Sequence, residues 1–188
     1  MHIPTRTYQR WGGAAVAVAT LAGAALLPTS AQAAVPVSWV DEQVNFVLGE
    51  QVASGAITSF DTKITPYFAN IAALGLVEAN TAASRAGALK WMQWYLGHLN
   101  TASTNVPANS VFDYTYDAAT GTETPTGDFD SVDSYASTTL NLAFEAYSSG
   151  DPALMGFVSA NIGKYEAIAN ILNFTAPIGV RVDTGPDA

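Results

Sequence analysis

The chain lacks cysteine altogether, so no disulfide bond stabilises any of its 188 residues. It is also poor in charge, since Asp, Glu, Lys and Arg together make up 12% of the residues. A domain without disulfide bonds must rely on a buried apolar core, and a hydrophobic content of 49% is sufficient to build one. The absence of cysteine also excludes thiolate zinc sites and thiol redox chemistry.

Basic residues are scarce beyond position 33. Five remain against all 16 acids, which gives residues 34–188 a net charge of −11 with His neutral. Binding to nucleic acid depends on a basic surface, and so does binding to an anionic membrane. We therefore expect neither of them as a partner. The five bases are Lys63, Arg85, Lys90, Lys164 and Arg181.

Residues 1–33 have the pattern of a secretory signal peptide. Arg6 and Arg10 precede an apolar run over residues 11–27, and Ala31-Gln32-Ala33 matches the small-x-small cleavage pattern. A membrane anchor is the alternative, but a run of this length is at the short limit for a spanning helix. The two arginines are separated, which favours the general secretory route over folded export. We expect a secreted, extracellular chain that has no membrane attachment after cleavage.

Apolar periodicity in the rest of the chain predicts an all-α domain over residues 34–172, followed by an irregular tail over residues 173–188. Ser38 and Thr65 are the expected N-caps of the first two helices, and Asp151-Pro152 begins the last, which has a kink near Asn161. The five expected helices span Ser38–Ala53, Pro66–Ala79, Ala82–Leu99, Ser131–Ser148 and Pro152–Leu172.

Two of these helices, the second and the fourth, carry almost no charge. A helix that is apolar all round belongs in the middle of a protein, so we expect both to be inner helices. Two long connections, residues 54–64 and 100–127, alternate with two tight ones. The second long connection is predicted to hold a short β-hairpin, with a strand over Val111–Tyr116 and a turn over Asp117–Gly121.

Helices joined by short loops pack as antiparallel hairpins, so the loop order predicts which helix ends meet. Both long connections then lie on one side of the domain. The N-termini of the second and fourth helices open onto that side, where their positive dipole ends face a common rim.

An acidic stretch enters the fourth helix at this rim and reads G-D-F-D-S-V-D-S-Y-A over residues 127–136. Carboxylates, hydroxyls and aromatic rings crowded together are typical of sites that bind polar, uncharged ligands. We interpret the stretch as part of a sugar site. A simpler interpretation remains open, in which Asp130 caps the helix and Ser131, Asp133 and Ser134 fill its first turn.

Several segments resemble the N-terminal part of six-hairpin (α/α)-toroid glycosidase-like proteins. They are T-P-Y-F-A-N-I-A-A-L-G-L, K-W-M-Q-W-Y-L-G-H-L-N, D-Y-T-Y-D and the acidic stretch, and the resemblance covers about Ser38–Leu172. It implies a toroid whose inner-helix rim binds oligo- or polysaccharide, with inverting hydrolysis in many enzymes of the fold. Five helices make two and a half hairpins. We therefore expect a partial toroid, belonging to a fragment or a truncated relative that is inactive as it stands.

Glycoside hydrolysis needs two carboxyl groups on either side of the scissile bond. Asp130 and Asp133 are the candidate catalytic pair, although both lie on one wall, so a partner across the cleft would come from Asp61, Asp113 or Asp117. No glutamate is evident as the general acid. The candidate substrate-binding residues are Asp128, Phe129, Ser134, Tyr135, Asp61, Asp113, Tyr114 and Tyr116.

Other chemistries find less support in the sequence. Trp91 and Trp94 could stack on sugar rings, but packing inside the helical domain is the stronger interpretation. His98 is best explained as a partner of a helix C-terminus. An EF-hand loop from Asp128 lacks the required Gly and Glu, which leaves weak calcium binding by Asp128 and Asp130. We expect no resident metal and no cofactor.

Three hypotheses follow from the sequence. The first is a secreted carbohydrate-active protein, glycoside hydrolase-like if it has any activity. The second is a secreted helical module that binds a partner without catalysis. The third is a fragment without function, which would expose the apolar flanks of its inner helices and aggregate.

Overall fold

The computed structural model describes residues 37–59, 62–103 and 106–172. These residues are mostly helical, with one small antiparallel sheet. The described helices are α1 (Val37–Gly49), α2 (Pro66–Ala79), α3 (Ala82–Gly97), α4 (Val132–Ser148), α5 (Pro152–Ala160) and α6 (Ile162–Leu172). The expected signal peptide, the tail over residues 173–188 and Asp61 lie outside the described residues.

The helix ends follow the capping signals of the sequence. α2 has the predicted bounds, and its C-cap residue Asn80 adopts a left-handed conformation. Thr81 caps α3 in a reciprocal capping box with Ser84. The Asp151 side chain accepts hydrogen bonds from the N–H groups of Ala153 and Leu154 at the start of α5. Local capping chemistry therefore marks the end of α2 and the starts of α3 and α5.

Two helix predictions were wrong in detail. Ser38 lies inside α1 and does not cap it, and α1 ends at Gly49 because Gln51 leaves the helix to bridge Ile57. The interruption predicted near Asn161 is confirmed, but it is a full break and not a kink, so the last helix is two helices, α5 and α6. There the Asn161 side chain donates to the carbonyl of Phe157, which satisfies a group at the end of α5.

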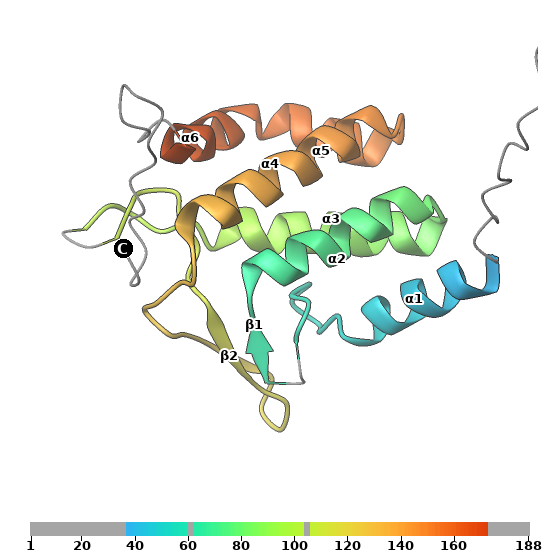
Figure 1. The fold of residues 1–188 in the computed structure, drawn as a ribbon, viewed down its shortest axis with the longest axis horizontal. Coiled ribbons are helices and arrows are strands. Elements are labelled where there is room, and N and C mark those ends of the chain that lie inside the picture. Colours follow the sequence, from blue (N-terminus) through green and yellow to red (C-terminus); the bar gives the residue numbers. More distant parts are fainter. Residues whose placement is uncertain (1–36, 60–61, 104–105, 173–188) are drawn as a thin grey trace, which may run out of the picture. The chain divides into compact units, whose positions relative to one another are not determined.

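The predicted β-hairpin is present as β2 (Tyr114–Asp117) and β3 (Thr122–Pro125). A third strand, β1 (Lys63–Ile64), was not predicted; it precedes α2 and pairs antiparallel with β2 through Ile64 and Tyr114. The order β1-β2-β3 ties the two long connections together. The sheet therefore lies at the N-terminal end of α2, as Figure 1 shows.

The helices alternate in direction. α2 and α4 pack side by side and run the same way, while α3 and α6 run back along them (Figure 1). The prediction that the N-termini of α2 and α4 share one rim is confirmed, because residues from both ends line one pocket. The core lies between this pair and the helices behind it, and its largest fully buried side chains include Trp91, Tyr95, Tyr135, Leu142, Leu154 and Ile168.

The prediction that α2 and α4 are buried on all sides was wrong. On α2, the side chains of Phe68 and Ile71 are 58% and 46% exposed. On α4, those of Phe144 and Tyr147 are 64% and 49% exposed. Each helix therefore has one face in the core and one apolar face that no described residue covers.

Candidate functional site

A small pocket opens where the N-terminal ends of α2 and α4 meet. Its volume is about 180 Å³. α2 contributes the exposed rings of Tyr67 and Phe68. The segment entering α4 contributes polar groups, among them the exposed carboxylate of Asp130. The remaining lining residues are Ser131, Ser134 and Tyr135.

Both helix ends leave backbone N–H groups uncapped by their cap residues. Thr65 and Ser131 occupy the N-cap positions of α2 and α4, yet neither side chain makes a capping hydrogen bond. The Ser131 hydroxyl instead donates to Asp133 Oδ1 at 2.6 Å and lies 2.9 Å from Ser134 Oγ. The positive ends of two helix dipoles thus face a pocket that holds hydroxyls and a carboxylate.

A hydrogen-bonded chain positions Asp130. Tyr135, which is 1% exposed, donates its hydroxyl hydrogen to Asp113 Oδ1 at 2.7 Å. The same hydroxyl accepts the N–H of Asp130 at 3.1 Å. The phenol therefore fixes the backbone of Asp130 against a buried carboxylate, and Asp113 and Tyr135 act as positioning groups for the pocket.

The backbone of Asp113 holds the same segment from the sheet side. Its N–H donates to the carbonyl of Asp128 at 2.9 Å, and its carbonyl accepts the N–H of Thr126 at 2.9 Å and the Thr126 hydroxyl at 3.0 Å. The Lys63 ammonium lies 3.3 Å from Asp113 Oδ2. The small sheet thereby fixes the acidic stretch relative to α4.

Burial has the largest effect on the pKa values of Asp113 and Tyr135. Desolvation raises the pKa of Asp113 above its ordinary value of 3.8, and the hydrogen bond from Tyr135 and the charge of Lys63 only partly oppose it. Burial, then the adjacent Asp113, raises the pKa of Tyr135. Tyr135 therefore stays protonated and continues to donate to Asp113 at physiological pH.

The two candidate catalytic residues occupy different environments. Asp130 is exposed and lines the pocket, whereas Asp133 is 6% exposed and bonded to Ser131. Among the described residues that line the pocket, Asp130 has the only carboxyl group. The structure thus places the predicted pair on one wall without bringing both carboxyl groups into the pocket.

The remaining candidates lie outside the pocket. The Asp128 carboxylate is exposed and accepts the N–H of Phe129, whose buried ring stacks on Phe112 with centroids 5.9 Å apart. Tyr114 is 8% exposed, and Tyr116 is half-buried in β2. These rings contribute to packing more than to a ligand surface, and Asp61 lies outside the described residues.

The packing interpretation of the two tryptophans is confirmed. Trp91 and Trp94 are 0% and 3% exposed, and their rings stack with centroids 4.9 Å apart. The Trp91 indole N–H donates to Asn70 Oδ1 at 2.9 Å. Asn70 also donates to the Tyr135 carbonyl at 3.3 Å, so it joins α3 through α2 to the helix that carries the pocket.

A second polar cluster around Glu123 was not found from the sequence. Its carboxylate accepts the indole N–H of Trp94 at 2.8 Å and pairs with the Ser54 hydroxyl. His98 Nε2 lies 3.8 Å from the same carboxylate, and His98 Nδ1 donates to the Trp94 carbonyl at 2.6 Å, as expected of a partner of a helix C-terminus. Glu123 lies in a hairpin with no distinctive motif, so no sequence signal marked it.

Comparisons of the chain with protein-family models, curated proteins and solved structures gave no match. In the described part of the chain, no three His, Cys, Asp or Glu side chains gather as a metal site would require. Nor does any helix there have the length and hydropathy to cross a bilayer. The geometry of the pocket is therefore the basis for proposing a function.

Proposed function

We propose that this chain is a secreted carbohydrate-binding protein and that one sugar ring of its ligand occupies the pocket between the N-termini of α2 and α4. The observation that carries the proposal is the juxtaposition of the rings of Tyr67 and Phe68 with the Asp130 carboxylate and the hydroxyls of Ser131 and Ser134. Aromatic faces accept the C–H groups of a pyranose, while carboxylates and hydroxyls bind its OH groups.

The size of the pocket favours a single ring. Sites for drug-sized ligands enclose about 300–1,000 Å³. This pocket, at about 180 Å³, is smaller. A longer saccharide would place one residue in the pocket and extend over the exposed ring of Phe68.

Binding is favoured over hydrolysis. An inverting pair of carboxyl groups stands about 6.5–9.5 Å apart on opposite sides of the bond, and a retaining pair about 5–5.5 Å apart. The pocket has Asp130 on one wall, and none of its other described lining residues is acidic. Hydrolysis would need a second carboxyl group from elsewhere, which fits a glycoside hydrolase-like chain that binds sugar but does not cleave it.

The toroid relationship belongs to the same proposal. α2 and α4 run in the same direction, with α1, α3 and α6 packed beside them, as consecutive hairpins of an (α/α) toroid would be. The exposed apolar face of α4, which holds Phe144 and Tyr147, is where a further inner helix would pack in a closed ring. The signal-peptide pattern of residues 1–33 supports secretion.

Isothermal titration calorimetry tests the proposal. The panel consists of glucose, galactose, mannose and N-acetylglucosamine, together with α- and β-linked oligomers of each. We expect binding of at least one of them, and Asp130→Asn should weaken it about tenfold because a charge-assisted hydrogen bond becomes a neutral one.

Asp128→Asn is the matched control. Asp128 is an exposed aspartate two positions away that does not line the pocket, and asparagine keeps its acceptor for the Phe129 N–H. The control should bind like the wild type. If no sugar binds, or if both variants lose affinity equally, the pocket is not the site.

A further inference from the structure

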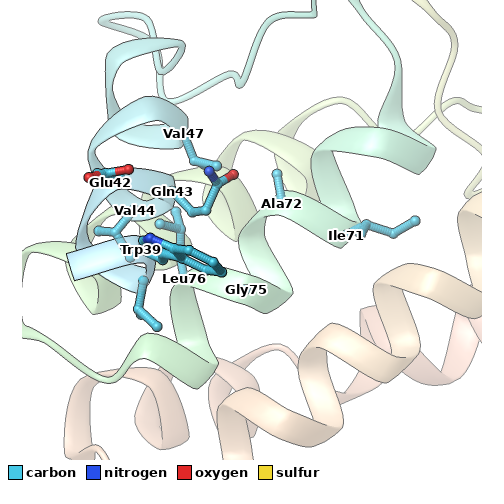
Figure 2. Close-up of a pocket in the computed structure, with 10 residues that line it drawn as sticks. Trp39, Glu42, Gln43, Val44, Val47, Ile71, Ala72, Gly75 and Leu76 are labelled. Atoms are coloured by element: carbon cyan, nitrogen blue, oxygen red, sulfur yellow. The ribbon is translucent and has the colours of Figure 1, made fainter. Parts of the chain in front are cut away.

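A long apolar groove runs between α1 and α2 and meets the pocket only at Phe68, which lines both. Its first part has a volume of about 510 Å³. Figure 2 shows Trp39, Gln43 and Val47 reaching from α1 toward α2, where Ala72 and Gly75 form the opposite wall. The absence of a side chain at Gly75 keeps that wall low, since a Cβ placed there would meet no atom within 4 Å.

The groove continues toward the C-terminal end of α1. A second hollow of about 420 Å³ shares Val47 and Ala72 with the first. It is lined by Phe46 of α1 and Phe68 of α2. The two hollows therefore form one continuous groove along the helix pair.

Three large aromatic side chains along the groove are exposed, and together they form an apolar patch. Trp39, Phe46 and Phe68 are 61%, 64% and 58% exposed. At about 150–250 Å² for each aromatic side chain, their exposed parts amount to roughly 300–450 Å². That is the size of the largest apolar patch on a typical monomer, which is often functional, but it is smaller than the roughly 800 Å² that each partner buries in a standard-size interface.

The charged residues that line the groove have one sign. Among the described residues that line its two parts, the charged ones are Glu42 and Glu50. The described residues of α1, α2 and α4 contain acids but no Lys, Arg or His. The basic residues of the other helices, Arg85, Lys90 and Lys164, lie on α3 and α6. Lys63 of β1 bridges Ser59 beside the second hollow, but its ammonium is paired with Asp113.

We infer that the α1–α2 groove binds a cationic amphipathic helix of a partner protein. An amphipathic helix lays its apolar face into such a groove through residues at i, i+3, i+4 and i+7. Lysine or arginine beside its apolar stripe would face Glu42 and Glu50. A second copy of this chain fits less well, because its own α1, α2 and α4 would oppose acid to acid.

The probe for a test is a leucine–lysine peptide with leucine at helical spacing, compared with a leucine–glutamate peptide of the same pattern. Binding to the whole protein is measured by calorimetry at physiological salt, where nonspecific attraction is screened. We expect the lysine peptide to bind at least tenfold more tightly than the glutamate peptide. No binding of the lysine peptide, or equal binding of both, overturns the proposal.

Gly75→Leu tests the location of the site. Leucine fills the groove, and it favours the helix by about 1 kcal/mol relative to glycine, so folding should be kept. Gly156→Leu is the matched control, since Gly156 is an exposed glycine of α5 with equal space around it. We expect Gly75→Leu to weaken binding at least tenfold and Gly156→Leu to leave it unchanged.

Charge variants separate specific from diffuse attraction. The double substitution Glu42→Gln and Glu50→Gln should weaken the lysine peptide several-fold, whereas Glu166→Gln on α6 should not. If Gly75→Leu binds like the wild type, or if all charge variants weaken binding equally, the attraction is nonspecific and the proposal fails. A dimer in ultracentrifugation that Gly75→Leu dissociates would assign the groove to a second copy and also overturn it.

Discussion

The two faces of α2 differ more than its sequence suggests. One face is packed into the core and contains Asn70, which is 1% exposed and bonded to Trp91, Thr138 and Tyr135. The open face holds the exposed side chain of Ile71 and the open position of Gly75. The polar residue is inside and the apolar residue is outside. Hydropathy alone would have reversed this assignment.

The difference shows that the buried side is defined by hydrogen bonding as well as by apolar contact. A buried amide is tolerated only when its donors and acceptors are satisfied, so Asn70 requires α3 and α4 in fixed positions. Ile71 and Gly75 on the open side need no hydrogen-bond partners from neighbouring helices. Function is proposed on the open side because its apolar groups are accessible there.

The largest predicted effect separates two neighbouring residues. Asn70→Ala should lower the free energy of unfolding by about 2–4 kcal/mol, because it leaves the buried Trp91 N–H without its acceptor. Ile71→Ala should change it by less than about 1 kcal/mol, since the side chain is half exposed and alanine favours the helix. Urea unfolding measures both. Equal losses would contradict the distinction between the faces.

Two tyrosines of α4 give the next comparison. Tyr135→Phe should cost about 2–3 kcal/mol, because the buried Asp113 carboxylate loses its phenolic donor and the Asp130 N–H loses its acceptor. Tyr147→Phe should stay within about 0.5 kcal/mol, since Tyr147 is 49% exposed. Thermal unfolding compares them. A Tyr135→Phe protein as stable as the wild type would remove Tyr135 as a positioning group.

The smallest effect concerns pH. Burial raises the pKa of Asp113, so the folded protein binds its proton more tightly than the unfolded chain does. The wild type should therefore lose stability relative to Asp113→Asn as pH rises from about 4 through the raised pKa, and the difference should be constant above it. Urea unfolding at successive pH values measures this.

Asp117 should change stability with pH in the opposite direction. Hydrogen bonds from the backbone of Ala119 and the side chain of Thr120 lower its pKa, so Asp117→Asn should remove a contribution that is lost as pH falls through the lowered pKa. Because Asp117 is exposed, that effect is small.

A wild type that gains stability relative to Asp113→Asn with rising pH would contradict the raised pKa of the buried Asp113 carboxyl group.

Much of the fold could be predicted because its signals are local. Thr65-Pro66, Thr81 and Asp151-Pro152 encode helix starts within three or four residues, and the structure follows them. The break at Asn161 was also visible. The strand β1 was not, because two residues carry no period and its pairing with β2 is set across the long loops.

The site could be predicted only in part, for the same reason. The stretch containing Asp130 and Ser134 was recognisable from composition, and loop order placed it at the correct rim. Sequence could not show that Phe68 of α2 meets it or that Asp133 turns inward, since both depend on how α2 packs against α4. The α1–α2 groove was missed because a sequence does not show which helix faces the other described residues leave uncovered.

The most direct test of the central claim is a two-dimensional NMR titration of the labelled protein with the sugar panel. A sugar that binds should shift the signals of Phe68, Asp130 and Ser134 at the rim and leave those of Gln43 and Gly75 in the groove unchanged. Shifts confined to the groove, or no shifts with any sugar, would contradict it.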